Sequence, residues 1–168
     1  MKKALFILTL LILASCGNTA VKKNHSLLGM EFQKFKQINQ LKNYIKVSDT
    51  VIYENNMEPK YGVLHLQNDS TNLVVFKSNT LGSIQNLTFK ILDTLVIPIS
   101  KNSDFITISY CTINDGNDEN IIAIVEKTDR LKIQNIKKVW SANTVSRKIE
   151  RITNLNGISC YNEFFIQK

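Results

Sequence analysis

Histidine and glycine are both scarce in this chain of 168 residues, and each shortage excludes a class of functional site. The two histidines, His25 and His65, stand alone, whereas a zinc or transition-metal site gathers three or four ligands at short spacings. The six glycines are scattered singly, so the chain has no glycine-rich phosphate loop, no dinucleotide fingerprint and no Gly-x-Ser-x-Gly nucleophile motif. We therefore expect no metal and no cofactor, and no residue can be named as catalytic.

Long apolar runs are also lacking, because the most apolar run covers only residues 4–14. A helix that spans a bilayer needs about 20 apolar residues, so this run is too short to cross one. Lys2 and Lys3 precede the run, and the small residues Ala14 and Ser15 end it. A basic start, a short apolar run and small residues at its end together predict a secretory signal.

The stretch Leu13-Ala14-Ser15-Cys16 resembles the lipobox of bacterial lipoproteins, in which signal peptidase II cleaves before a cysteine. The resemblance implies that residues 1–15 are removed and that Cys16 is acylated, so that it anchors the protein in membrane lipid. The alternatives are an ordinary secretory signal, or a buried thiol that lies at this position by chance. Gly17 stands where an aspartate would favour the inner membrane. By the same resemblance, we expect an outer-membrane protein that faces the periplasm.

Stretches of the C-terminal third are similar to small lipoproteins of Bacteroidota. The similarity lies in Ile-Ala-Ile-Val before a charged turn, in Lys-Lys-Val-Trp, and in Gly-Ile-Ser-Cys-Tyr-Asn-Glu. It implies a secreted, β-rich fold and indicates no activity.

Loss of residues 1–15 would leave 19 Lys and Arg against 14 Asp and Glu, a formal charge of +5. Outside the cytoplasm this charge favours an anionic glycan, a lipid headgroup or an envelope protein as partner, and not nucleic acid. Acylation of Cys16 would leave Cys111 and Cys160 as an even pair in an oxidising compartment. We predict a disulfide between these two cysteines. A Cys160–His65 dyad is the alternative, although His65 is expected to be a half-exposed strand residue.

The region from residue 127 to 151 is rich in cations that would share a face if its two strands formed a hairpin. This candidate anionic-ligand face consists of Lys132, Lys137, Lys138, Arg147, Lys148 and Arg151. A solvated strand surface is the alternative reading.

Three of the seven aspartates precede Ser or Thr, which resembles the tripeptides used for protein O-glycosylation in Bacteroidota. The resemblance implies Thr50, Ser70 and Thr94 as candidate sites if their hydroxyls are exposed. The acidic residues 115–119 could also suggest a calcium loop. Asn120 replaces the glycine that such a loop requires at its sixth position, so a hairpin turn is the better interpretation.

Apolar residues at spacings of three and four predict one helix over residues 27–42, preceded by a polar tether at 16–26. Its apolar stripe would consist of Leu28, Phe32, Phe35, Ile38 and Leu41.

Beyond residue 43, short β-branched segments separated by turn residues predict a mainly β domain. These segments are 44–53, 62–67, 72–77, 84–91, 94–99, 105–113, 121–127, 131–140, 145–152 and 158–166. We expect residues 27–168 to form one domain, an antiparallel sandwich or barrel-like sheet with the helix packed on it. The unbroken apolar run 121–125 predicts a strand covered on both faces, and Pro98 should end its strand or lie at an edge.

These features favour a non-catalytic binding or structural role in the cell envelope. An enzyme acting on envelope glycans or peptides is one alternative, and it would need carboxylates such as Glu54, Glu58 or Asp104 to converge. An inhibitor or immunity lipoprotein that caps a secreted enzyme is the other. A deep pocket with paired carboxylates would favour the enzyme, and a flat apolar patch would favour the inhibitor.

Overall fold

The structure is a computed structural model that describes residues 27–53, 59–80, 87–100 and 103–165. The predicted signal 1–15, the acylation site Cys16 and the tether 16–26 lie outside these residues, as do Glu54 and Glu58. No helix in the described part of the chain is long and apolar enough to cross a bilayer.

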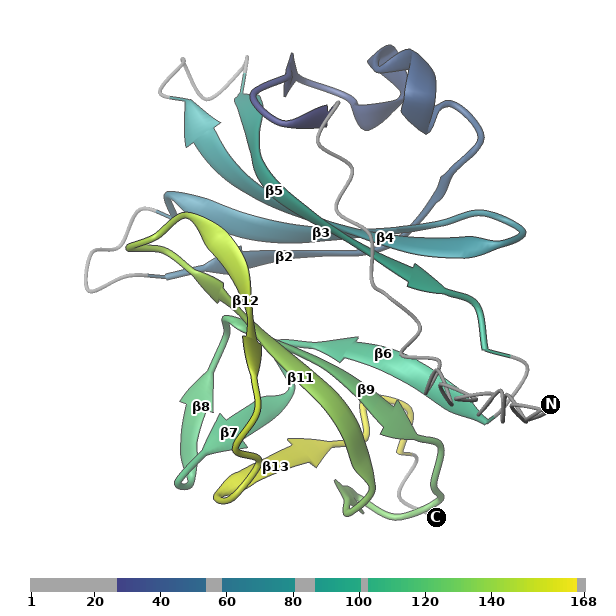
Figure 1. The fold of residues 1–168 in the computed structure, drawn as a ribbon, viewed down its shortest axis with the longest axis vertical. Coiled ribbons are helices and arrows are strands. Elements are labelled where there is room, and N and C mark those ends of the chain that lie inside the picture. Colours follow the sequence, from purple (N-terminus) through teal and green to yellow (C-terminus); the bar gives the residue numbers. More distant parts are fainter. Residues whose placement is uncertain (1–26, 54–58, 81–86, 101–102, 166–168) are drawn as a thin grey trace, which may run out of the picture.

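Three antiparallel sheets make up the fold (Figure 1). Sheet A has the strand order β1 (Glu31–Phe32), β5 (Thr88–Pro98), β4 (Thr71–Thr80), β3 (Tyr61–Gln67) and β2 (Ile45–Ile52). Sheet B has the order β12 (Lys148–Ile152), β11 (Ile136–Asn143), β9 (Ile121–Glu126) and β6 (Asp104–Ile108). Sheet C has the order β10 (Lys132–Ile133), β13 (Ile158–Tyr161), β7 (Cys111–Ile113) and β8 (Gly116–Asp118). The predicted mainly β, antiparallel class is confirmed.

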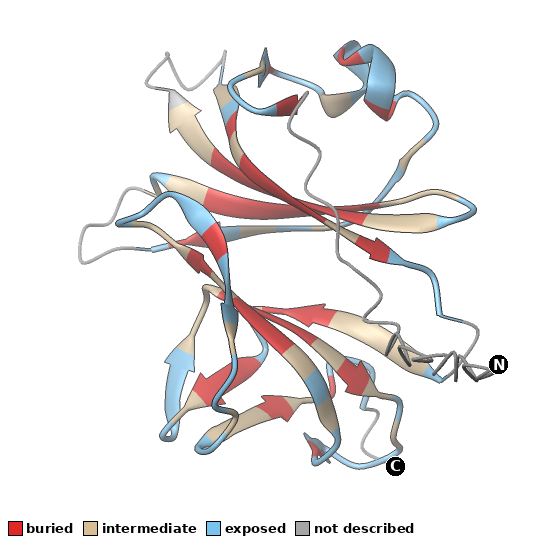
Figure 2. Cartoon of the chain, in the orientation of Figure 1, coloured by how far each residue is buried: buried red, intermediate tan, exposed pale blue. Residues whose placement is uncertain are grey.

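Sheet B is the middle layer, and both of its faces are packed. One face meets sheet A across a core that includes Val74, Phe76, Ile122 and Trp140. The other face meets sheet C across a core that includes the two cysteines and Val139. Strand β9 serves both cores because its side chains alternate, and Ile121 to Ala123 and Val125 are fully buried. Figure 2 shows the resulting buried centre of the molecule in red, where the sheets pack together. The prediction of a strand covered on both faces is confirmed.

The predicted helix over residues 27–42 is wrong. Gly29 has a φ of +79°, which is left-handed and incompatible with a right-handed helix, and strand β1 then pairs with β5. Two short 3-10 helices follow, η2 (Phe35–Gln37) and η3 (Asn39–Leu41). Phe35, Ile38 and Leu41 stand three residues apart, which is the repeat of a 3-10 helix as well as part of an α-helical stripe.

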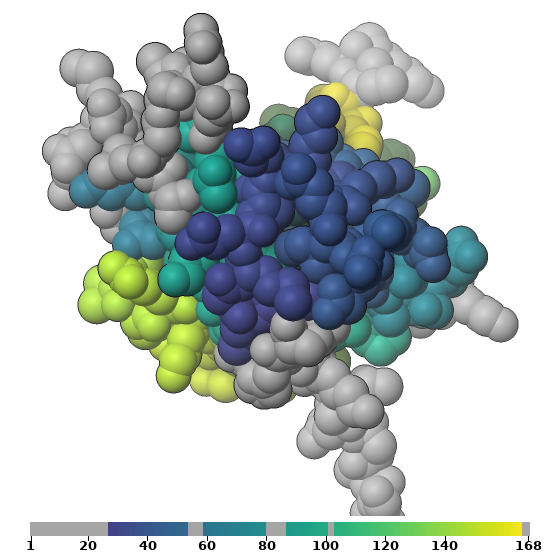
Figure 3. All heavy atoms as spheres, turned by 90° about the horizontal axis from the view of Figure 1, so that it is seen from above, coloured from purple at the N-terminus to yellow at the C-terminus, as the bar shows by residue number. Residues whose placement is uncertain are grey.

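The N-terminal segment nevertheless covers the outer face of sheet A, as was expected of the helix. Figure 3 shows residues 27–42 spread over this face. Leu27, Phe32, Ile38 and Leu41 are buried there against strands β3, β4 and β5. Leu28, which was predicted to belong to the apolar stripe, is exposed, and its neighbour Leu27 is buried instead.

Several strand boundaries differ from the prediction. The predicted segments 84–91 and 94–99 merge into β5, which is irregular opposite Phe76 and Lys77 and ends at Pro98 as expected. The predicted segment 105–113 splits into β6 and β7 beside Ser109, whose φ is +67°. The predicted segment 158–166 stops being a strand at Tyr161.

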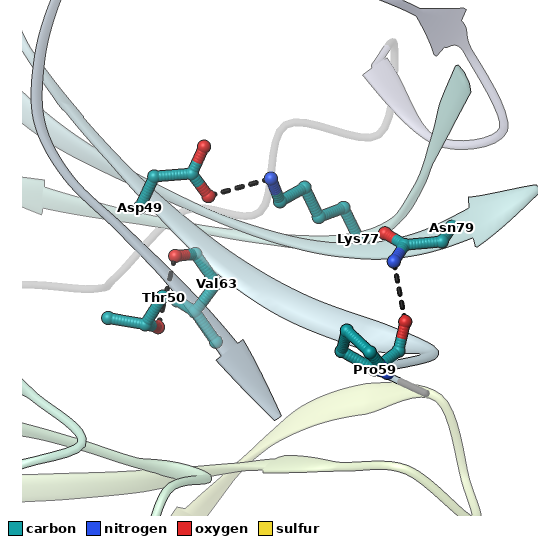
Figure 4. Close-up of polar contacts among 6 residues, drawn as sticks. All are labelled: Asp49, Thr50, Pro59, Val63, Lys77 and Asn79. Atoms are coloured by element: carbon teal, nitrogen blue, oxygen red, sulfur yellow. Dashed lines mark hydrogen bonds and ion pairs between the residues drawn. The ribbon is translucent and has the colours of Figure 1, made fainter. Parts of the chain in front are cut away.

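A buried lysine crosses sheet A on its outer face. Lys77 of β4 is 3% exposed, and its ammonium lies 2.7 Å from Asp49 Oδ1 on β2 (Figure 4). The ammonium also lies 3.9 Å from the centre of the Phe89 ring. Strand β3 lies between the strands of Lys77 and Asp49. A Cβ added at Gly62 of β3 would lie 3.2 Å from Lys77 Cε and 2.6 Å from the Thr50 carbonyl oxygen. Glycine at this position therefore leaves room for the lysine stem.

The disulfide between Cys111 and Cys160 is present and confirms that prediction. The two cysteines are directly opposite each other on the neighbouring strands β7 and β13, in the core between sheets B and C. The alternative Cys160–His65 dyad is therefore wrong, because Cys160 is bonded to Cys111 and His65 belongs to sheet A.

Candidate functional site

A cleft opens where sheets A and B separate at one end. It has a volume of about 570 Å³, within the usual range for a small-molecule pocket. Its lining residues come from sheets A and B, from the segment that follows β5 and from the segment after β13. They are Val47, His65, Gln67, Asn72, Ile97, Pro98, Ile99, Ser100, Asp104, Phe105, Ile106, Ile124, Lys137, Lys138 and Phe164.

The floor of the cleft is apolar and continues the core between sheets A and B. Ile106 of β6 and Ile124 of β9 are cross-strand partners, and both pack against that core while remaining half-buried. Ile97 of β5 belongs to the same core and is 6% exposed. Further along the same strands, the gap is filled by Ile108 and Ile122, which are almost fully buried. The floor of the cleft is therefore the part of the core between sheets A and B that the two sheets no longer cover.

The wall on sheet A is polar and uncharged. His65 is only 4% exposed, so the expectation of a half-exposed strand residue is wrong. Its Nε2 lies 3.0 Å from Asn72 Oδ1, and because an amide oxygen can only accept, Nε2 carries the proton. Burial lowers the pKa of His65, and the hydrogen bond with Asn72 partly offsets that effect. The imidazole is therefore neutral at pH 7, and Gln67 adds a neutral amide beside it.

The wall on sheet B carries the charges. Lys137 Nζ donates to Asp104 Oδ1 at 2.5 Å, and this hydrogen bond raises the pKa of Lys137. Lys138 follows directly on β11 and is the cross-strand partner of Ile124. The side chains of Lys138 and Ile124 therefore lie on the same face of sheet B, toward the cleft. Among the described residues, no acidic side chain forms an ion pair with Lys138.

An aromatic pair forms the rim of the cleft. Phe164 packs edge-on against Phe105, with ring centres 5.4 Å apart, although Phe164 remains 64% exposed. Asn162 fixes this short turn, because its Nδ2 donates to the Thr128 carbonyl at 2.7 Å and its Oδ1 accepts the Phe164 N–H at 3.0 Å. Phe164 does not continue β13, because that strand ends at Tyr161.

Glu163 lies in the same turn. Partial burial raises the pKa of its carboxyl, although the residue is exposed.

The six cations of the candidate anionic-ligand face do not come together. Lys137 and Lys138 line the cleft, at the start of β11. Arg147 and Lys148 lie at the opposite end of that strand. Arg147 is in the turn between β11 and β12, and Lys148 is the first residue of β12. Arg151 is exposed on edge strand β12, opposite Trp140, and Lys132 lies on sheet C, above the ring of Tyr161. Only the first two cations therefore share a concave site.

The three candidate glycosylation sites differ in exposure. Thr94 is fully buried, so its hydroxyl is not accessible in the folded protein. Thr50 is half-buried, and its hydroxyl donates to the Val63 carbonyl (Figure 4). Ser70 is exposed in the turn between β3 and β4, so it remains the candidate that an enzyme could reach.

The acidic residues 115–119 form a hairpin, as the sequence favoured, and not a calcium loop. Asn114 and Asp115 both have positive φ and join β7 to β8 as a two-residue turn. Glu119 is occupied as an acceptor, because its Oε2 accepts the Tyr53 N–H at 2.8 Å. In the part of the chain that the structure describes, no three His, Cys, Asp or Glu side chains are placed to hold a metal ion.

Sequence reasoning found part of the cleft and missed the rest. It singled out Lys137 and Lys138 as cations, and Asp104 as a carboxylate. It did not bring His65 or Ile106 together with them, because these residues lie on separate sheets. The only available signal was the alternation along each strand, which gives the face of a side chain but not which sheet lies opposite.

Asp104 is the one carboxylate among the described lining residues, and Lys137 occupies it. Hydrolysis by paired carboxylates would need a second one at a suitable distance. No protein-family model, no curated protein and no solved structure matches the chain, so the cleft is interpreted from its own residues.

Proposed function

We propose that the protein is a lipid-anchored lipoprotein of the outer membrane, facing the periplasm, whose β domain binds a small, partly apolar molecule without catalysis. The observation that carries the proposal is the cleft of about 570 Å³ between sheets A and B. Apolar side chains cover its floor, and a few polar groups stand on its walls, as is typical of ligand sites.

Two features of the chain support the location. The lipobox-like stretch before Cys16 favours acylation, and three acyl chains would each contribute about 0.8 kcal/mol per buried methylene to membrane binding. The Cys111–Cys160 disulfide is typical of a protein that folds in an oxidising compartment.

Metabolic labelling tests the anchor. Cells given an alkyne fatty acid should label the wild-type protein and not Cys16→Ser, whose precursor should also stay uncleaved. Equal labelling of the two proteins would overturn the lipoprotein assignment and leave the binding proposal to be judged separately.

Fluorescence of an uncharged apolar probe, N-phenyl-1-naphthylamine, tests the cleft. The chain from residue 16 onward, made without the signal and therefore without acyl groups, should enhance the probe's emission with one site per chain. Ile124→Glu places a charge in the floor and should abolish the enhancement. Ile45→Glu changes an exposed isoleucine outside the lining and should leave it intact. Equal enhancement by the two folded variants would show that the probe binds elsewhere.

A further inference from the structure

We infer that the ligand of the cleft is an amphiphile with an apolar chain and a single anionic head, such as a carboxylate, and that Lys138 binds the head. This inference rests on the proposed binding function and adds the chemical class of the ligand.

The charges of the lining give the first argument. Four ionisable groups line the cleft among the described residues, namely His65, Asp104, Lys137 and Lys138. His65 is neutral at pH 7, and Asp104 and Lys137 neutralise each other at 2.5 Å. Lys138 therefore leaves the lining with one uncompensated positive charge, which a monoanion would balance and which would repel a cation.

The register of sheet B gives the second argument. Ile106, Ile124 and Lys138 are successive cross-strand partners on β6, β9 and β11, so they form one row across the sheet. Neighbouring side chains in such a row stand about 5 Å apart on the same face. An apolar chain lying along the two isoleucines would therefore bring its head directly to the lysine.

The rest of the cleft suits a ligand whose apolar chain has only one charged end. On sheet A, Ile97 faces the floor, and the polar groups beside it, His65 and Asn72, are neutral. At the rim, Phe164 is mostly exposed beside Phe105, so a bound chain would cover apolar surface that water now contacts. Among the described lining residues, the other cation, Lys137, is paired with Asp104, which argues against a large polyanionic headgroup such as a phosphorylated glycolipid.

Three ligands with the same chain length test the inference. The chain from residue 16 onward is titrated below micelle concentration with dodecanoate, dodecanol and dodecyltrimethylammonium, each displacing N-phenyl-1-naphthylamine. We expect dodecanoate to bind about tenfold more tightly than dodecanol, the usual gain from a hydrogen bond to a charged group, and the ammonium compound to bind most weakly. Raising the salt concentration should reduce the preference for dodecanoate.

Substitutions locate the head. Lys138→Gln should reduce the affinity for dodecanoate to that for dodecanol and leave dodecanol and the neutral probe unchanged, while Lys138→Arg should keep the preference. The matched control is Lys148→Gln, an exposed lysine at the far end of the hairpin. Equal affinity for dodecanoate and dodecanol, or an unchanged preference in Lys138→Gln, would overturn the inference while probe binding upholds the proposed function. If no ligand and no probe binds, both are wrong.

Discussion

The two faces of sheet B meet very different surroundings. Toward sheet C, the core is closed by a disulfide and lined by Ile121, Ala123, Val125 and Val139, all fully buried. Toward sheet A, the core is equally tight around Ile122 but ends at the half-buried Ile124, only two residues further along the same strand. One strand therefore supplies both a sealed core and the floor of an open cleft.

Two polar links join sheets A and B at the end of their shared core that lies away from the cleft. Asp93 on β5 accepts the Ile149 N–H of β12 at 2.8 Å, and Glu119 accepts the Tyr53 N–H after β2. Both links lie toward the end of the layers where Ile108 and Ile122 are packed. At the other end, the ion pair Lys137–Asp104 joins two strands within sheet B and does not reach sheet A. The layers are thus held together at one end and separate at the other.

Removing the disulfide should have the largest effect and should act on the sealed side alone. In the chain-entropy model, a cross-link between cysteines 49 residues apart contributes about 4 kcal/mol to the free energy of unfolding. Cys111→Ala/Cys160→Ala should lose about that amount in a urea titration. The affinity for the neutral probe should stay the same as long as the variant is folded. A parallel loss of probe binding in the folded variant would show that the cleft depends on sheet C.

Two isoleucines on β9 test the contrast within one strand. Ile122→Ala leaves a cavity in a filled core and should cost about 3 kcal/mol of the free energy of unfolding. Ile124→Ala removes a side chain that water already reaches and should cost only about 1 kcal/mol. The effect on probe binding should be reversed, with Ile124→Ala the weaker binder. Equal losses of stability at the two positions would mean that the cleft is as well packed as the core.

Asp93→Ala tests the link between sheets A and B. The substitution leaves the buried Ile149 N–H without its carboxylate acceptor, which should cost about 2 kcal/mol. Hydrogen exchange should become faster at Ile149 and remain slow at Cys160, which lies in the core between the other two layers. If exchange became faster in both places by the same factor, the three layers would unfold as one unit.

The pH dependence at His65 should be the smallest effect. Burial lowers the pKa of this histidine in the folded state, so the unfolded chain takes up the proton first as the pH falls. The stabilisation is therefore fully present above the unfolded pKa of about 6.5 and is lost as the pH falls below it. Urea titrations at pH 7.5 and 5.0 give the free energy of unfolding at each pH. The difference between the two values should be smaller for His65→Gln than for the wild type. His25→Gln serves as the control and should keep the wild-type difference.

The sequence predicted the strands well because alternation and turn residues act locally. The apolar run 121–125, Pro98 and the hairpin at the acidic residues 115–119 agree with the predictions made on that basis. The helix over 27–42 failed because a spacing of three suits a 3-10 helix equally well, and because pairing of β1 with β5 is a long-range contact. The cleft could not be predicted for the same reason, since His65 and Lys138 belong to different sheets.

The register that places Lys138 over the floor also gives the protein an optical reporter of its own. Trp140 is the only tryptophan of the chain, it is 4% exposed, and it stands two residues from Lys138 on the same face of β11. Successive side chains on one face of a strand are about 7 Å apart, so the indole lies close to where a bound head would neutralise the lysine. Its emission in the folded protein should be that of an apolar environment, and should change in intensity as the cleft fills. Occupancy could therefore be followed without any added dye.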